Sequence, residues 1–117
     1  MQLAWLSPQL EDSCVSGVHL RAAANGQVAA AEDLLHVVAH APRLANLVTF
    51  QSVRIGVNAG NLTLSIEEVE MHVRPLSPDG VPRAVLDRAA LPDHASSQAL
   101  LVQDFHIRGR SILRPAI

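Results

Sequence analysis

A chain of 117 residues, 49% of them hydrophobic, is long enough to bury one core, and we expect a single domain over residues 1–117. Its net charge of −2 argues against a general attraction to nucleic acid or to an anionic membrane surface. The single cysteine, Cys14, excludes an internal disulfide, and the N-terminal residues have no basic or long apolar stretch typical of a signal peptide or membrane span. We therefore expect a soluble, cytoplasmic protein.

The first third of the chain predicts two strands and then a helix. Residues 2–6 form a short apolar run, typical of an edge strand. Residues 14–21 alternate between two faces and predict a second strand. From residue 27 the apolar period becomes helical, and we expect the main helix over 27–41. Pro42 should end it, because proline supplies no amide hydrogen.

The stretch 47–74 predicts a long central β-hairpin. Two runs of alternating apolar residues flank the turn sequence Asn58-Ala-Gly-Asn61. If the chain folds back about this turn, every apolar residue meets another apolar residue, which favours this register over a slip of one residue. The expected pairs are Val57 with Leu62, Ile55 with Leu64, Val53 with Ile66, Phe50 with Val69 and Val48 with Met71.

The apolar phase changes within this predicted hairpin, at 51–52 in the first strand and at 67–68 in the second. Successive side chains of a strand point to opposite faces, so the two halves of the hairpin would bury opposite faces. A bulge in each strand, which would keep one face buried, is the alternative. In the first case a surface near the turn lies outside the cover of the main helix, and its residues are Val53, Ile55, Val57, Leu62, Leu64 and Ile66.

The remaining residues predict a loop, a short helix and a returning strand. Three prolines and an Asp-Gly pair make 75–82 a loop, and 83–91 reads as a short helix. In the strand expected over 99–107, Leu101, Phe105 and Ile107 share one phase and Gln103 is an exception. The whole pattern predicts an α+β fold with a mostly antiparallel sheet of about four or five strands.

The expected aliphatic surface near the turn leads to the functional expectation. Six aliphatic side chains, at ~1.5–3 kcal/mol each on burial, need a cover that so short a chain does not obviously supply. We therefore expect a non-enzymatic protein–protein interaction or assembly module, homo-oligomeric or bound to a protein partner, as in a component of a larger particle. A domain that binds a small apolar, lipid-like ligand is the alternative, and a small enzyme using His and Glu or Asp is a third hypothesis.

Histidines and carboxylates supply the candidate chemistry. Glu32, His36 and His40 are spaced four apart on the main helix, which would put them on one face, as in a helical metal site. We interpret them as an exposed polar face, with metal binding as the alternative, to which His72, His94 or His106 could contribute. The other carboxylates of interest are Glu67, Glu68, Glu70 and Asp104, which we interpret as a solvated patch, with acid–base chemistry as the alternative.

The densest group of basic residues, Arg108, Arg110 and Arg114, could bind an anion. No aromatic residues interleave with these arginines, as stacking on single-stranded nucleic acid would require. We therefore expect no nucleic-acid partner, and instead expect these arginines to pair with Glu67, Glu68 or Glu70. No motif in the sequence implies a cofactor.

Overall fold

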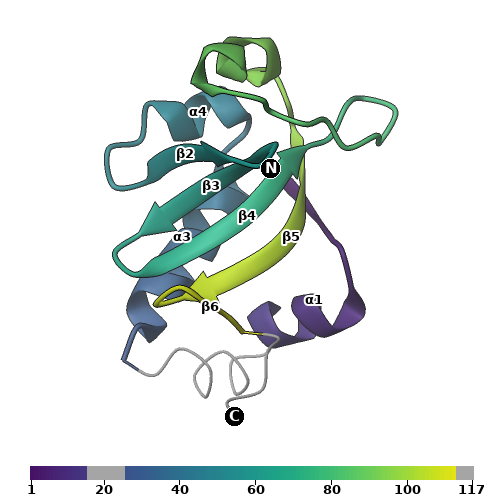
Figure 1. Cartoon of the computed structure of the whole chain (residues 1–117). Helices are drawn as coiled ribbons and strands as arrows, with labels where there is room; N and C mark the ends of the chain where they lie inside the picture. The colour runs from purple at the N-terminus through teal and green to yellow at the C-terminus, as the bar shows by residue number, and fades with distance from the viewer. Residues whose placement is uncertain (16–25, 113–117) are drawn as a thin grey trace.

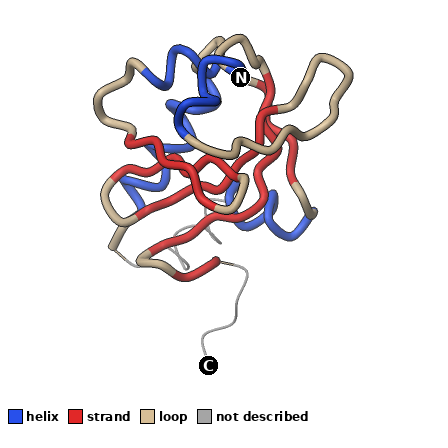
Figure 2. The backbone as a smooth tube through the Cα atoms, turned by 45° about the horizontal axis from the view of Figure 1, so that its top comes forward, coloured by secondary structure: helices blue, strands red, loops and turns tan. Residues whose placement is uncertain are grey.

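The computed structural model describes residues 1–15 and 26–112, which form a layer of helices packed on one β-sheet (Figure 1). In chain order the elements are β1 (Gln2–Trp5), α1 (Pro8–Val15), α3 (Val28–His40), α4 (Leu44–Val48), β2 (Arg54–Asn58), β3 (Asn61–Ile66), β4 (Val69–Pro75), the 3-10 helix η1 (Arg88–His94), β5 (Ala99–Ile107) and β6 (Arg110–Ser111). Figure 2 shows the strands running side by side, with the loop that follows β4 projecting beyond them.

The sheet has the order β1-β5-β4-β3-β2, and the short strand β6 pairs with β5. Only β1 and β5 are parallel among these pairs, and the other neighbours are antiparallel. The α+β class and the mostly antiparallel sheet are therefore confirmed. The predicted main helix over 27–41 is also confirmed, as α3.

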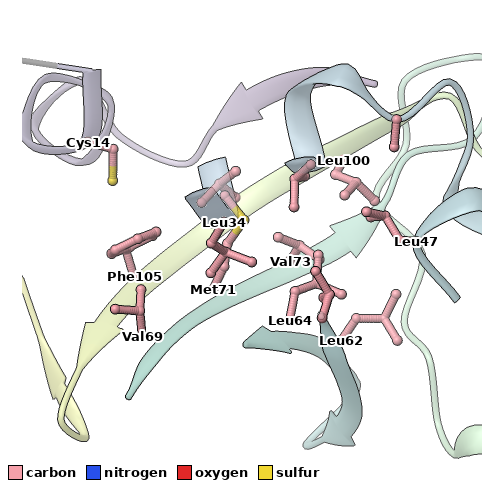
Figure 3. Close-up of a cluster of buried hydrophobic side chains, with 14 of the residues drawn as sticks. Cys14, Leu34, Leu47, Leu62, Leu64, Val69, Met71, Val73, Leu100 and Phe105 are labelled. Carbon is pink, nitrogen blue, oxygen red and sulfur yellow. The ribbon is translucent and has the colours of Figure 1, made fainter. Parts of the chain in front are cut away.

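The core lies between one face of the sheet and the helices (Figure 3). Along β4 buried and half-buried residues alternate strictly, because the period of a strand is two. Leu34 of α3, Leu47 of α4 and Cys14 of α1 pack against this face. The sheet supplies side chains that are fully buried: Leu62, Leu64, Val69, Met71, Val73, Leu100, Val102 and Phe105.

The predicted hairpin is correct at its turn and wrong beyond it. Ile55 pairs with Leu64 and Val57 with Leu62, as expected. The chain then turns again at 67–68, where Glu67 has a φ of 52°, and β4 returns alongside β3. The expected pairs of Val53 with Ile66, Phe50 with Val69 and Val48 with Met71 do not form. Val48 ends α4, and both Val48 and Phe50 are exposed.

This second turn explains the change of apolar phase. A two-residue turn puts Ile66 opposite Val69, so the inward positions shift by three along the sequence while staying on one face. The strand therefore needs neither a change of buried face nor a bulge at this point. Three strands, β2, β3 and β4, point their apolar side chains into a single interior.

The surface expected to bind a partner is consequently part of the chain's own core. Leu62 and Leu64 are 0% exposed and Val53 is 7% exposed. The other three members of the expected interface, Ile55, Val57 and Ile66, are half-buried and pack against the core. The helices of the same chain supply the cover, so this hairpin does not need a second copy to shelter it, contrary to expectation.

Two further elements differ from expectation. Cys14 and Val15, expected to begin a strand over 14–21, lie in α1, and residues 16–21 fall outside the described part of the chain. The short helix expected over 83–91 begins instead at Arg88, as η1, where the Asp87 side chain accepts a hydrogen bond of 3.0 Å from the Ala90 amide. Within the described ranges, no helix has the length and apolar character needed to span a bilayer.

Candidate functional site

The face of the sheet opposite the core carries polar side chains at its centre. We call it the polar face, and its central residues are Thr63 and Ser65 of β3, Glu70, His72 and Arg74 of β4, Asp104 and His106 of β5, and Ser111 of β6. They alternate with the core residues along each strand, which places them away from α1, α3 and α4. Apart from Ser111, which is buried, all of them are half-buried.

A β-bulge sets the direction of the two residues that β5 contributes. The register between β4 and β5 shifts at His72/Val73, so that Val102 faces Val73 and Asp104 faces His72, with Gln103 between them. The extra residue lets Val102 point into the core while Asp104 points to the polar face. The bulge also explains why Gln103 breaks the predicted phase. The predicted phase is wrong for Leu101, which does not point inward with Phe105 and Ile107, since Leu100 and Val102 are the buried residues there.

Four ionisable side chains form a square at the centre of the polar face. Glu70 lies opposite His106, and His72 lies opposite Asp104. Each carboxylate therefore has one imidazole along its own strand and another across the strand pair. The two imidazoles lie on one diagonal and stack, with ring centroids 4.3 Å apart and ring planes at 18°.

Each imidazole also has a carboxylate close to its Nε2 atom. His106 Nε2 lies 2.9 Å from Asp104 Oδ2, with hydrogen-bond geometry. His72 Nε2 lies 2.6 Å from Glu70 Oε1, but it has no hydrogen-bonding partner among the described residues, so this short contact is a poorly directed ion pair. The square is thus well ordered on β5 and less completely satisfied on β4.

Asp104 is the most heavily hydrogen-bonded member of the square. Its Oδ1 accepts from Ser111 Oγ at 2.6 Å and from the Phe105 amide at 2.9 Å. Partial burial acts to raise the pKa of Asp104, but the bonds from Ser111, Phe105 and His106, with the charge of His106, outweigh it and hold the pKa below its usual range. Asp104 is therefore an ionised carboxylate at neutral pH.

The arrangement is not that of a nucleophilic enzyme. The Ser111 hydroxyl donates to Asp104, so the carboxylate lies between the hydroxyl and the His106 imidazole. In a nucleophilic triad the imidazole occupies that middle position, because it must take the proton of the hydroxyl. The square can orient imidazoles, change its charge with protonation and present alternating charges to a binding partner.

The predicted metal-site residues lie elsewhere and do not form a site. Glu32, His36 and His40 are exposed on α3, in the helical layer. The two rings are 4.0 Å apart, and His40 Nδ1 lies 2.9 Å from the His36 carbonyl oxygen rather than facing a shared ligand position. Across residues 1–15 and 26–112, no three His, Cys, Asp or Glu side chains are arranged to hold a metal ion.

The predicted arginine cluster is only partly described. Arg108 donates from Nε to Glu68 Oε2 at 2.9 Å, which is the ion pair expected as the alternative to anion binding. Arg110 is exposed on β6, and Arg114 lies outside the described residues. Beside the square, a hollow of about 270 Å³ is lined by residues of both signs, including Arg54, Glu67, Glu68, Glu70, His106 and Arg108.

The interior offers no support for the apolar-ligand alternative. The space between sheet and helices is filled by side chains such as Leu34, Met71 and Phe105, each 0% exposed (Figure 3). A second hollow, of about 700 Å³, lies at the end of the sheet, but its lining mixes charged, polar and apolar residues.

The sequence carries a signal for the square that the prediction of separate sites misses. Glu70-x-His72 and Asp104-x-His106 repeat the same spacing, an acid two residues before a histidine, in two predicted strands. Such spacing puts both side chains on one face of each strand. The sequence groups Glu70 with Asp104 as carboxylates and His72 with His106 as histidines, and only the pairing of β4 with β5 joins the two groups.

Comparisons with known proteins do not identify a family. No protein-family model matches the chain, and no curated protein and no solved structure shows significant similarity to it.

Proposed function

We propose that the protein is a non-enzymatic protein-interaction module that associates with a second copy of itself through the polar face. The observation that carries this proposal is the square of Glu70, His72, Asp104 and His106, in which acids and imidazoles occupy alternate corners. Alternating corners make a surface that can complement itself, as a two-fold symmetric dimer requires.

The register of β4 with β5 defines where the two-fold axis of the proposed dimer lies. Let a two-fold axis run along the strands, midway between β4 and β5, with the two sheets face to face. The second copy's β5 then lies over β4, and the partner's His106 lies over Glu70. The same operation puts the partner's Asp104 over His72, so all four corners meet a group of the opposite kind.

The charge of the square makes this association depend on pH. When both imidazoles are neutral, the two carboxylates leave each square negative, Arg74 beside it offsets only one of these charges, and two like faces repel. Protonated imidazoles, which histidine forms in general toward lower pH, would offset the two carboxylates of the square and provide cationic corners for the partner's carboxylates. Arg54, Arg74, Arg108, Glu67 and Glu68 lie around the square, and histidine is the side-chain type whose charge ordinarily changes near neutral pH. The association is expected to strengthen as pH falls.

The size of the face predicts a weak complex. Five strands ~4.8 Å apart and about six residues long at ~3.4 Å each give a footprint of ~480 Å². A standard stable interface buries about 800 Å² per partner. The dimer should therefore be transient, with a dissociation constant of roughly 10–100 µM, and populated only at high protein concentration.

Sedimentation equilibrium at pH 8 and pH 5.5 tests the proposal. Protein concentrations between ~10 µM and ~1 mM cover the range in which a weak dimer forms. We expect molar mass to rise with concentration and to rise more at pH 5.5. At pH 5.5, Glu70→Lys should weaken association, because it would oppose a cationic His106 of the partner subunit with a like charge. Glu32→Lys makes the same change on the exposed face of α3 and should leave association unchanged. A strictly monomeric protein at ~1 mM and both pH values would refute the proposal.

A further inference from the structure

A second site is built at the end of the sheet, away from the square. We call it the end cleft: a hollow of about 700 Å³ where β1 and β5 begin and β4 ends. Its volume falls within the ~300–1,000 Å³ typical of small-molecule sites. The lining comes from the start of β1, the loop after β4, the end of η1 and the residues leading into β5. The loop after β4, which supplies part of this lining, projects beyond the strands (Figure 2).

Backbone hydrogen bonds hold the walls of the end cleft in place. The Leu76 amide donates to Ala99 O at 2.9 Å, and the Arg83 amide donates to Pro75 O at 2.8 Å. Ser97 Oγ lies 3.1 Å from Leu76 O and 2.9 Å from Ala99 O. Two prolines, Pro75 and Pro78, stiffen the same wall. A preformed cleft lowers the ordering cost of binding a ligand.

The charged groups at the end cleft are not paired with each other. Arg83 and Asp93 both line it, both are exposed, and neither forms an ion pair with another described residue. Arg83 acts at longer range on Asp79, where its charge adds to the hydrogen bonds from Ser77 and the backbone that hold the pKa of that carboxyl low. The guanidinium and the Asp93 carboxylate therefore remain available to a ligand.

We propose that the end cleft binds a short peptide with free amino and carboxyl ends. Arg83 takes the carboxylate, for which a guanidinium offers two parallel donors. Asp93 takes the ammonium. The apolar parts of the wall, from Pro75, Leu76 and Pro78, contact the peptide side chains, and Gln98 can bond its amide groups. This site shares no residue with the square, so it stands whether or not the protein dimerises.

Titration of ¹⁵N-labelled protein with trialanine, followed by NMR, tests the inference. We expect saturable shifts at amides around 76, 83 and 94–99, with an affinity in the millimolar range. The capped peptide N-acetyl-trialanine amide should bind at least threefold more weakly. Arg83→Gln and Asp93→Asn should each weaken trialanine binding about three- to tenfold, the modest loss expected for exposed charges. Arg110→Gln, at the opposite end of β5, is the matched control and should have no effect.

Several results would overturn the inference. One is the absence of saturable shifts around the end cleft at ~20 mM trialanine, well above the affinity of a millimolar site. Another is equal binding of the capped peptide, which would show that the free ends are not recognised. A third is unchanged affinity in both Arg83→Gln and Asp93→Asn, with the fold of each variant verified by its amide spectrum.

Discussion

Replacing Leu64 by Ala tests whether the central strands face the chain's own core. Leu64 is 0% exposed and lies between Ile55 on β2 and Met71 on β4. Removing a fully buried leucine side chain costs about 2.7–5 kcal/mol, from lost transfer energy and the cavity left behind. Against a total stability of roughly 5–15 kcal/mol, this is a large fraction. At roughly 3–5 °C per kcal/mol for a chain of this length, the melting temperature should fall by about 8–25 °C.

Leu86 provides a matched control, because it is 81% exposed and the substitution is the same. Leu86→Ala should change the free energy of unfolding by no more than about 0.5 kcal/mol. Urea unfolding followed by circular dichroism at low protein concentration measures both variants as monomers. If Leu64→Ala were as mild as Leu86→Ala, and instead abolished association at high concentration, Leu64 would belong to an interface and the account of the core would be wrong.

The other predictions concern Cys14 and Asp104. Burial, with the charge of Asp104, raises the pKa of the Cys14 thiol to about 12, so it should react with a disulfide reagent at pH 8 only after unfolding; rapid reaction of the folded protein would contradict its position in the core. Ser111→Ala removes a hydrogen bond to Asp104 and should cost about 1–2 kcal/mol at pH 7. The pKa of Asp104 is lower in the folded state than in the unfolded state, where it is ~3.9. The ionised carboxylate therefore stabilises the fold at pH values above the unfolded-state pKa, and this stabilisation is lost as pH falls through the folded-state pKa. The difference between wild type and Ser111→Ala should therefore shrink at pH 2.5, and urea unfolding that showed a constant difference would argue against it.

The elements with strong local signals were predictable from the sequence. The turn at 58–61 has Gly60 at a φ of 82°, a conformation that glycine adopts without strain, and the alternation on both sides fixed the pairing of β2 with β3. The helical period from Val28 onward located α3 equally well.

The elements that the sequence predicted wrongly lack a distinguishing local signal. A tight turn at 67–68, a bulge and a change of buried face all shift the apolar phase by one residue, so the pattern alone could not separate them. α1 is short, and its buried residues, Leu10 and Cys14, are defined by packing against the sheet. The pattern of 83–91, which predicts one helix, does not reveal that Asp87 caps a helix that begins only at Arg88.

The candidate site depended on tertiary pairing even more strongly. Neither acid–histidine pair is unusual alone, since each occupies one face of one strand. Their union into a square needed β4 beside β5 in one register, with the bulge at Gln103 turning Asp104 outward. Pairing between β4 and β5 joins residues about 30 positions apart, which local patterns do not encode.

Comparing the amide NMR spectrum at ~20 µM with that at ~1 mM, at pH 5.5, tests the central functional claim most directly, because this range spans the expected weak association. If two copies meet through the square, the resonances that move on concentration should belong to outward positions of β3, β4 and β5, with the amides near Glu70, His72, Asp104 and His106 moving most. Spectra that superimpose at both concentrations, or shifts confined to α1, α3 and α4, would contradict the account.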